Sequence, residues 1–370
     1  MIPGEPRRES RDLVVAELLE WSKKLGRKNY TPNPLTPRLI NESPRMAQAR
    51  EHVLPSGAQG TYHVLSRCTR REFLLGGRDN EHRRAWAVGL LADLLDGFAI
   101  DLHAYAIMSN HAHLVLRPRP DLAAQWSTQQ VARRGLTQIP ARSGAGLEPL
   151  PVTRGLIERY ADNNPWVVEH RARLCSLTWF MKLFKQRLAR RANAEDDVSG
   201  HFWESRFLSV PLLGNGAVFG CMAYVDRNPL RARMVTDLAD AVFTSIAQRL
   251  SVAGIGRRPV YFHEDDRRLG ACLTPLSACH PVNGLTGERE LGPVTLDDYH
   301  ALVAPGPLSP TARTCCDRLG IDAVVWRTAI SDGGLFQGVA VGNRTARAAF
   351  AATQGKKIIA DKTGVWASDG

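Results

Sequence analysis

The segment that most constrains this chain lies at residues 100–118, IDLHAYAIMSNHAHLVLRP. Side chains alternate in character on both sides of Ser109-Asn110, which is typical of two strands joined by a tight turn. Because strand side chains repeat every two residues, His111 and His113 share one face and the residues between them share the other. The chain is therefore predicted to contain an antiparallel hairpin with two imidazoles at the start of its second strand.

His111 and His113 are candidate metal ligands. Two neighbouring imidazoles on a rigid strand offer two nitrogens to a divalent cation, and they leave its other positions open to a third protein ligand, water or a phosphate oxygen. An isolated His-x-His pattern is more often two polar residues on a solvent-exposed strand face. The other segments of the sequence are needed to choose between a metal site and an ordinary strand face.

Composition narrows the class of protein. The chain has 370 residues, a 44% hydrophobic content that can fill a core, and a net charge of +11 that points towards polyanions such as nucleic acid. We expect no membrane partner, because the most apolar segment, residues 85–100, carries two aspartates. A polar start and seven scattered cysteines without a Cys-x-x-Cys pair predict a soluble, cytoplasmic protein without a disulfide framework.

The order of elements predicts an α+β fold. A strand at residues 60–68, a helix at 81–95 and then the hairpin form the first part of a ferredoxin-like (RRM-like) antiparallel sheet with helices on one face. Residues 1–57 are predicted to be a partly helical lead-in, residues 58–240 the main domain, and residues 250–370 a mainly helical accessory region. Its predicted short helices lie at residues 296–302, 311–319 and 340–353.

A predicted helix at residues 174–193 combines an apolar stripe with a basic face. Its cations include Arg187, Arg190 and Arg191, which we predict to contact a phosphate backbone. A solvated charged face is the alternative interpretation.

Four segments together resemble the HUH tyrosine transposases, particularly the REP-associated branch. The hairpin Met108-Ser109-Asn110-His111-Ala112-His113 is similar to the signature of that family. The other three segments occur in the expected order: Tyr62-His63-Val64 with Ser66-Arg67, then Gly200 to Phe207, then Tyr224-Val225-Asp226-Arg227-Asn228-Pro229-Leu230-Arg231-Ala232. The match spans residues 58–240, and four ordered motifs are more specific than one His-x-His.

The resemblance implies DNA cleavage and rejoining in transposition. It implies binding of single-stranded or hairpin DNA and a Mg²⁺ or Mn²⁺ ion held by His111 and His113. A tyrosine on a helix beside the sheet would attack phosphorus and form a 5′-phosphotyrosine, which makes the family DNA endonucleases and recombinases. Arg206 and Arg231, within two of the matching segments, are candidate DNA-binding residues; an equal alternative is that they anchor loops through backbone carbonyls. The sequence leaves open whether the chain forms a homodimer.

The chain departs from the family pattern in the predicted helix at residues 174–193. The positions where the family carries tyrosine align with Arg187 or Leu188, and no tyrosine lies between Ala161 and Ala223. Gln186 is the candidate side-chain oxygen ligand on this helix.

Three explanations follow from the missing tyrosine. Another tyrosine serves as the nucleophile, with Tyr160 and Tyr224 as the candidates and packing as the favoured interpretation of Tyr224; or a metal-bound water attacks; or the protein is a catalytically inactive, domesticated DNA-binding protein. Enzymatic activity therefore stays undecided at this point. An RNA-binding module is a weaker alternative, because the predicted strands lack evident stacking aromatics.

Overall fold

The computed structural model describes residues 60–353 except 78, 144–147, 256–263, 280–293, 332–335 and 337–339. The predicted lead-in at residues 1–57 lies outside these residues. All described residues belong to one compact unit, residues 49–370.

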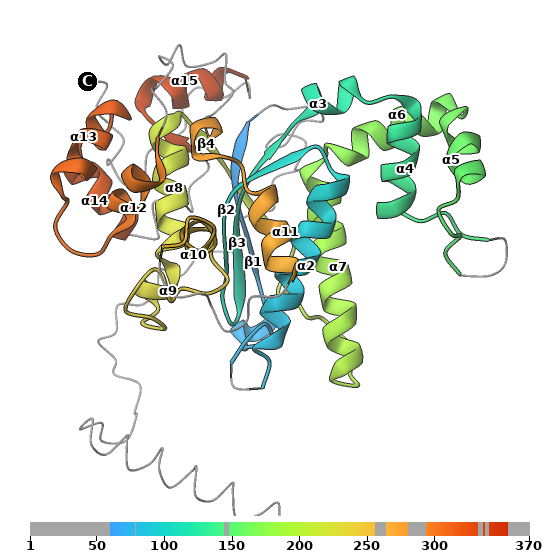
Figure 1. Cartoon of the computed structure of the whole chain (residues 1–370), viewed down its shortest axis with the longest axis horizontal. Coiled ribbons are helices and arrows are strands. Elements are labelled where there is room, and N and C mark those ends of the chain that lie inside the picture. Colours follow the sequence, from blue (N-terminus) through green and yellow to red (C-terminus); the bar gives the residue numbers. More distant parts are fainter. Residues whose placement is uncertain are drawn as a thin grey trace, which may run out of the picture. The chain divides into compact units, whose positions relative to one another are not determined.

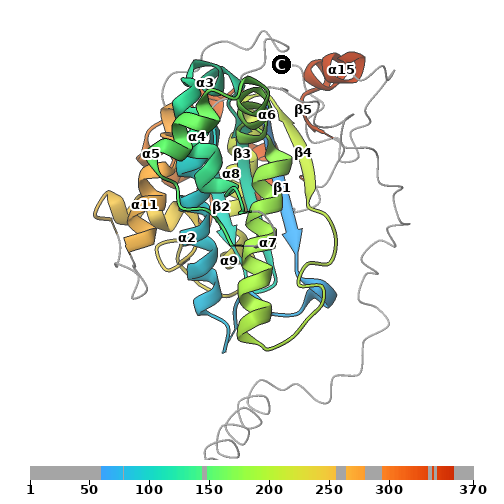
Figure 2. The same ribbon diagram turned by 90° about the vertical axis from the view of Figure 1, so that its right-hand side faces the viewer.

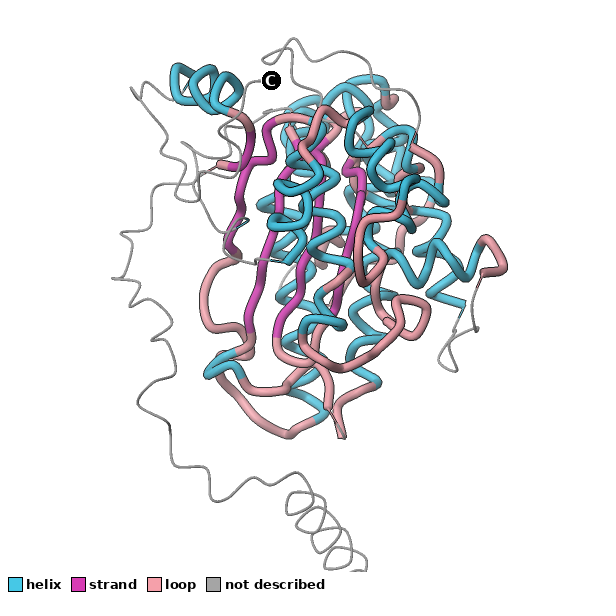
Figure 3. The backbone as a smooth tube through the Cα atoms, turned by 90° about the vertical axis from the view of Figure 1, so that its left-hand side faces the viewer, coloured by secondary structure: helices cyan, strands magenta, loops and turns pink. Residues whose placement is uncertain are grey.

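A mixed five-stranded sheet has the strand order β2-β3-β1-β4-β5. Its strands are β1 (Thr61–Arg67), β2 (Ile100–Ile107), β3 (His111–Pro118), β4 (Leu208–Leu213) and β5 (Val341–Gly342). The pairs of β1 with β3, β1 with β4 and β2 with β3 are antiparallel, whereas the short β5 is parallel to β4. Figure 3 shows the four longer strands side by side. The predicted first strand and hairpin are thus confirmed to within one residue.

Helices account for most of the remaining described chain. The helix at Thr128–Gln138 begins after Ser127, which forms a capping box with Gln130. The helices are α2 (His82–Gly97), α3 (Pro120–Gln125), α4 (Thr128–Gln138), α5 (Arg154–Ala161), α6 (Asn164–Leu174), α7 (Leu177–Glu195), α8 (Asn215–Asp226), α9 (Asn228–Arg231), α10 (Ser245–Val252), α11 (Glu264–Cys272), α12 (Leu296–Val303), α13 (Pro310–Arg318), α14 (Ala323–Ser331) and α15 (Arg344–Thr353), with 3₁₀ turns η2 (Thr69–Arg71) and η3 (Leu276–Ala278).

One face of the sheet packs against α2 and α7, which run along the strands in Figure 2. Val64 of β1 and Leu114 and Leu116 of β3 are fully buried in this core, together with Phe180 and Phe184 of α7. The three- and four-residue spacing of the apolar residues predicts this stripe on α7. Its basic residues consequently lie on the side away from the sheet.

The other face of the sheet is also covered, which corrects the prediction of helices on one face only. Helix α8 packs on this face, and α12 and α14 pack on α8 from the other side (Figure 1). Val115 and Val210 from the strands share one core with Val218 of α8 and Trp326 of α14. Helices from both sides of residue 250 therefore fill the same core.

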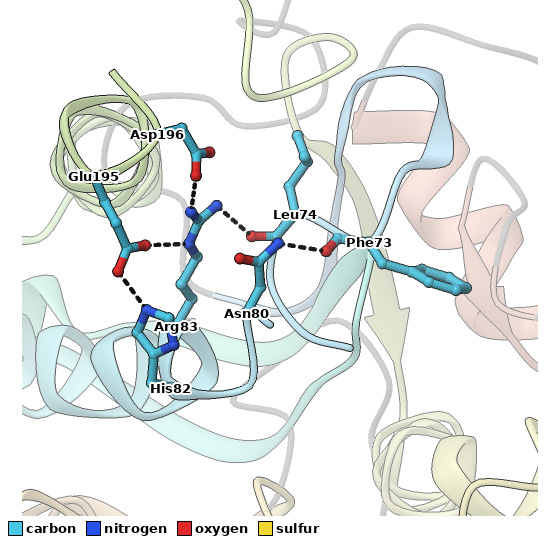
Figure 4. Close-up of polar contacts among 7 residues, drawn as sticks. All are labelled: Phe73, Leu74, Asn80, His82, Arg83, Glu195 and Asp196. Carbon is cyan, nitrogen blue, oxygen red and sulfur yellow. Dashed lines mark hydrogen bonds and ion pairs between the residues drawn. The ribbon is translucent and has the colours of Figure 1, made fainter. Parts of the chain in front are cut away.

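A buried arginine ties α2 to the end of α7. Arg83 is 1% exposed, and its Nε donates to Glu195 over 2.7 Å while a second nitrogen donates to Asp196. Its third nitrogen donates to the carbonyl oxygen of Leu74, and His82 also contacts Glu195 (Figure 4). These contacts fix how the α2–α7 layer lies beneath the loop that follows β1.

Within the described parts of the chain, no helix has the length and apolar character needed to cross a membrane.

Candidate active site

The two candidate metal ligands lie on the sheet face that α8 covers. His111 pairs with Arg67 of β1, and His113 pairs with Leu65. Alternation along β1 puts His63, two residues before Leu65, on the same face. Nε2 of His63 lies 2.8 Å from Nδ1 of His113, and the two rings are nearly parallel with centroids 5.1 Å apart.

The turn before β3 positions His111. The carbonyl oxygen of Ser109 accepts from the backbone nitrogens of Leu75 and Gly76, and that of Asn110 accepts from Cys68. The side chain of Asn110 donates to the carbonyl oxygen of Arg71 over 2.9 Å, and its Oδ1 lies 2.6 Å from Nδ1 of His111. The Ser-Asn dipeptide therefore holds the imidazole of His111 as well as turning the chain.

All three histidines are held neutral near pH 7. Burial lowers the pKa of His63 and His111 to about 4, and it lowers the pKa of His113 well below its ordinary value. The positive charges of Arg67 and Arg231 lower the pKa of His111 and His113 further. A neutral imidazole keeps a lone pair on one nitrogen, which a metal ligand requires.

Tyr224 of α8 is the tyrosine beside these histidines. Its ring centroid lies 5.7 Å from that of His113 and 6.0 Å from that of His63, in edge-on arrangements. Phe336 contacts the same ring at 5.1 Å, and the guanidinium carbon of Arg231 lies 4.7 Å from its centroid. Tyr224 is thus enclosed by aromatic rings and one cation.

The structure does not bring Tyr160 or Gln186 to the histidine pair. Tyr160 of α5 contacts Trp166 of α6, and Gln186 is exposed on α7. Helices α5 and α7 lie on the far side of the sheet from α8 (Figure 1). The helix predicted to carry the nucleophile is therefore the one on the opposite face from His111 and His113, because their side chains point towards α8.

The candidate DNA-binding arginines differ in their surroundings. Arg187 donates to the backbone and side-chain oxygens of Gln138, and burial lowers its pKa, so it links α7 to the end of α4. The guanidinium carbon of Arg191 lies 3.8 Å from the ring centroid of Trp86. The exposed ones are Arg190, Arg191, Arg206 and Arg231. Arg231 lies at the histidine site, and Arg187 is structural.

The residues present fit a divalent ion in part. Within the described residues, no group of three or more His, Cys, Asp or Glu is arranged to hold a metal. His111 and His113 offer two neutral imidazoles, a donor set that suits Mn²⁺ better than Mg²⁺, which prefers oxygen ligands. The remaining positions of a bound ion would have to come from water or from a substrate phosphate.

Two further residues of β1 contribute to the site. The sequence places His63 at the site only if its strand is central; β1 is an inner strand, and Nε2 of His63 lies 2.8 Å from Nδ1 of His113. Arg67 was not selected as a candidate, although its register opposite His111 follows from the strand pairing. The signal for both was the two-residue period of residues 61–67 combined with knowledge of the neighbouring strand.

Comparison with known proteins adds little. No model of a protein family and no curated protein matches the sequence. A solved structure of the REP-associated tyrosine transposase bound to a REP hairpin aligns with 60% of this chain and 90% of that chain, at 13% identity and a TM-score of 0.28. An alignment at this level is compatible with a distant relationship at most and establishes neither the fold nor the function of this chain.

Proposed function

We propose that this chain binds single-stranded or hairpin DNA, and cleaves and rejoins it in transposition through a covalent bond to Tyr224. The observation that carries the proposal is the position of the Tyr224 ring, 5.7 Å from the ring of His113 and on the same sheet face. The strand order β2-β3-β1-β4 with helical crossovers also supports a ferredoxin-like assignment. The four ordered motifs and the net charge of +11 support the DNA substrate.

His111 and His113 are the proposed ligands of a Mn²⁺ or Mg²⁺ ion. When bound, a divalent ion supplies Lewis-acid polarisation of a phosphate oxygen. Both imidazoles are neutral near pH 7, so they do not repel a cation. Arg67 and Arg231 would place two positive charges beside the phosphate, and these stabilise charge that develops on its oxygens.

The phenol oxygen of Tyr224 is the proposed nucleophile. It forms a bond to phosphorus while the bond from phosphorus to the 3′ oxygen breaks, which leaves a 5′-phosphotyrosine and a 3′ hydroxyl. The phenol proton leaves to solvent, and the departing 3′ oxygen gains one. A 3′ hydroxyl of another strand reverses the step and restores the phenol, so rejoining needs no external energy source.

The first test is a denaturing gel of the protein incubated with a labelled hairpin oligonucleotide and Mn²⁺. We expect a labelled band at the mass of the protein, and we expect Tyr224→Phe and His111→Ala to abolish it. Tyr160→Phe is the matched control and should retain the band. A band that survives in Tyr224→Phe and disappears in Tyr160→Phe would contradict the assignment of the nucleophile.

A second candidate function is DNA binding without cleavage. It is favoured by the burial of Tyr224, which is 4% exposed and lies against the fully buried Phe336. In that case the oligonucleotide would be shifted on a native gel and remain uncut with Mn²⁺. Free cleaved product without a covalent band would instead indicate attack by water.

A further inference from the structure

His63 and the backbone at Phe336 form a hydrogen-bonded chain that ends on His113. Nδ1 of His63 lies 3.1 Å from the carbonyl oxygen of Phe336, and Nε2 of His63 lies 2.8 Å from Nδ1 of His113. His63 and His113 are 2% and 3% exposed, so water does not compete for these contacts. These hydrogen bonds link His63 to Phe336, which lies 273 positions away in the sequence.

The acceptor at Phe336 determines where the hydrogens lie. A carbonyl oxygen can only accept, so Nδ1 of His63 must carry the hydrogen of that contact. The ring neighbours of His63 are His113, Tyr224 and Phe336, none of which carries a negative charge that would favour an imidazolium. A neutral imidazole has one N–H, so Nε2 of His63 is an acceptor.

The consequence for His113 follows directly. Its Nδ1 must donate the hydrogen to Nε2 of His63, and the lone pair of His113 is therefore on its own Nε2. His111 reaches the same tautomer by a separate route. The side-chain nitrogen of Asn110 donates to Arg71, which leaves Oδ1 of Asn110 to accept from Nδ1 of His111.

We propose that His63, held by the Phe336 carbonyl, is a positioning residue that fixes His113 in the tautomer with its lone pair on Nε2. For the metal site this inference rests on the proposed function, whereas the tautomer itself does not require an ion. Hydrogen bonds to the second nitrogen are the usual way in which a protein orients a metal-binding histidine. Here the donor and acceptor groups come from β1 and from the segment that follows α14.

The tautomer can be measured directly. Long-range ¹H–¹⁵N correlation spectra of the full chain, labelled at histidine and free of metal, distinguish a protonated ring nitrogen from one with a lone pair. We expect the wild-type spectrum to show His113 with hydrogen on Nδ1. In His63→Phe, which keeps an aromatic ring but has no acceptor, His113 should become a mixture of tautomers.

Two further variants control this experiment. His63→Gln retains an amide that can donate to Phe336 and accept from His113, so it should restore the wild-type tautomer. His103→Phe makes the same change at a buried histidine of β2 and should leave His113 unaffected. Mn²⁺ titrations followed by electron paramagnetic resonance should show about 10- to 100-fold weaker binding in His63→Phe than in the wild type.

Hydrogen on Nε2 of His113 in the wild type would overturn the proposal. So would a wild-type tautomer in His63→Phe, if that variant is folded. If the His113 tautomer changes in His63→Phe as expected but the wild type binds no Mn²⁺, the positioning role of His63 is supported and the proposed metal site is contradicted.

Discussion

Two arginines determine the charge around the candidate site. Arg67 and Arg231 both act electrostatically on His111 and His113, and they make the protonated forms of these imidazoles less favourable. The site therefore has positive charge even before a cation binds. A phosphate is the group that would balance this charge, and this argues for an anionic substrate at the histidines rather than for a site that binds a cation alone.

Replacing Arg231 tests this interpretation. Arg231→Gln should weaken binding of a single-stranded oligonucleotide and reduce the slope of log affinity against log salt by about 0.7, the value for one lost phosphate contact. Fluorescence anisotropy at several salt concentrations measures both quantities.

Arg187→Gln is the matched control, because Arg187 donates to Gln138. It should leave the salt slope unchanged and lower the free energy of unfolding by about 1–3 kcal/mol. An equal loss of affinity in the two variants would show that Arg231 has no special position.

At the scale of elements, periodicity predicted the strands and their faces, but it did not predict which helix lies over the histidines. The alternation along β3 correctly separates His111 and His113 from Leu114 and Leu116. The choice of helix depended on an alignment of α7 with the family's tyrosine, and the structure has α8 on that face instead. A usable signal existed in the sequence, since residues 217–225 are almost all apolar, and nearly every residue of α8 is buried in the structure. A helix that is apolar all round must be covered on both sides, whereas the amphipathic α7 needs only one partner.

The last residue of α8 anchors that helix to two others. Asp226 is fully buried and accepts hydrogen bonds from Ser245 Oγ over 2.5 Å, the Ile246 backbone nitrogen over 2.9 Å and Tyr299 Oη over 2.6 Å. Burial raises its pKa from 3.8 to about 6, although these hydrogen bonds act in the opposite direction. The carboxyl group therefore keeps its proton in the folded protein at pH values where the unfolded chain has lost it.

This difference makes stability depend on pH. Between about pH 4 and pH 6 the unfolded chain ionises Asp226 first, so its contribution to the wild-type stability falls as the pH rises. Asp226→Asn has no such proton, and its free energy of unfolding relative to wild type should increase by about 2.4 kcal/mol from pH 4 to pH 7. Urea denaturation of both proteins at each pH measures this. The buried histidines titrate in both proteins, so their effect on the free energy of unfolding cancels when the two proteins are compared. A difference in free energy of unfolding that does not change with pH would contradict the raised pKa of Asp226.

At the scale of the whole molecule, the C-terminal region completes the core that holds the site. The sequence predicts a mainly helical accessory region there, and its expected short helices correspond to α12, α13 and α15. Their packing could not be predicted, because it depends on contacts between residues far apart in the chain. Tyr299 and Trp326 are fully buried in the core that contains α8, and Phe336 contacts Tyr224 and His63.

Because the sheet and the C-terminal helices share one core, a cavity in the C-terminal region must destabilise the described unit as a whole. Trp326 is fully buried, and its Nε1 donates to the carbonyl oxygen of Leu302. Trp326→Ala should therefore lower the free energy of unfolding by about 3–5 kcal/mol. Val324→Ala, on the same helix but 73% exposed, should change it by less than about 0.5 kcal/mol. Calorimetry should show one transition that moves to lower temperature in Trp326→Ala, since a single core unfolds cooperatively. Two transitions, of which only one moves, would mean that the sheet and its histidines fold without the C-terminal helices.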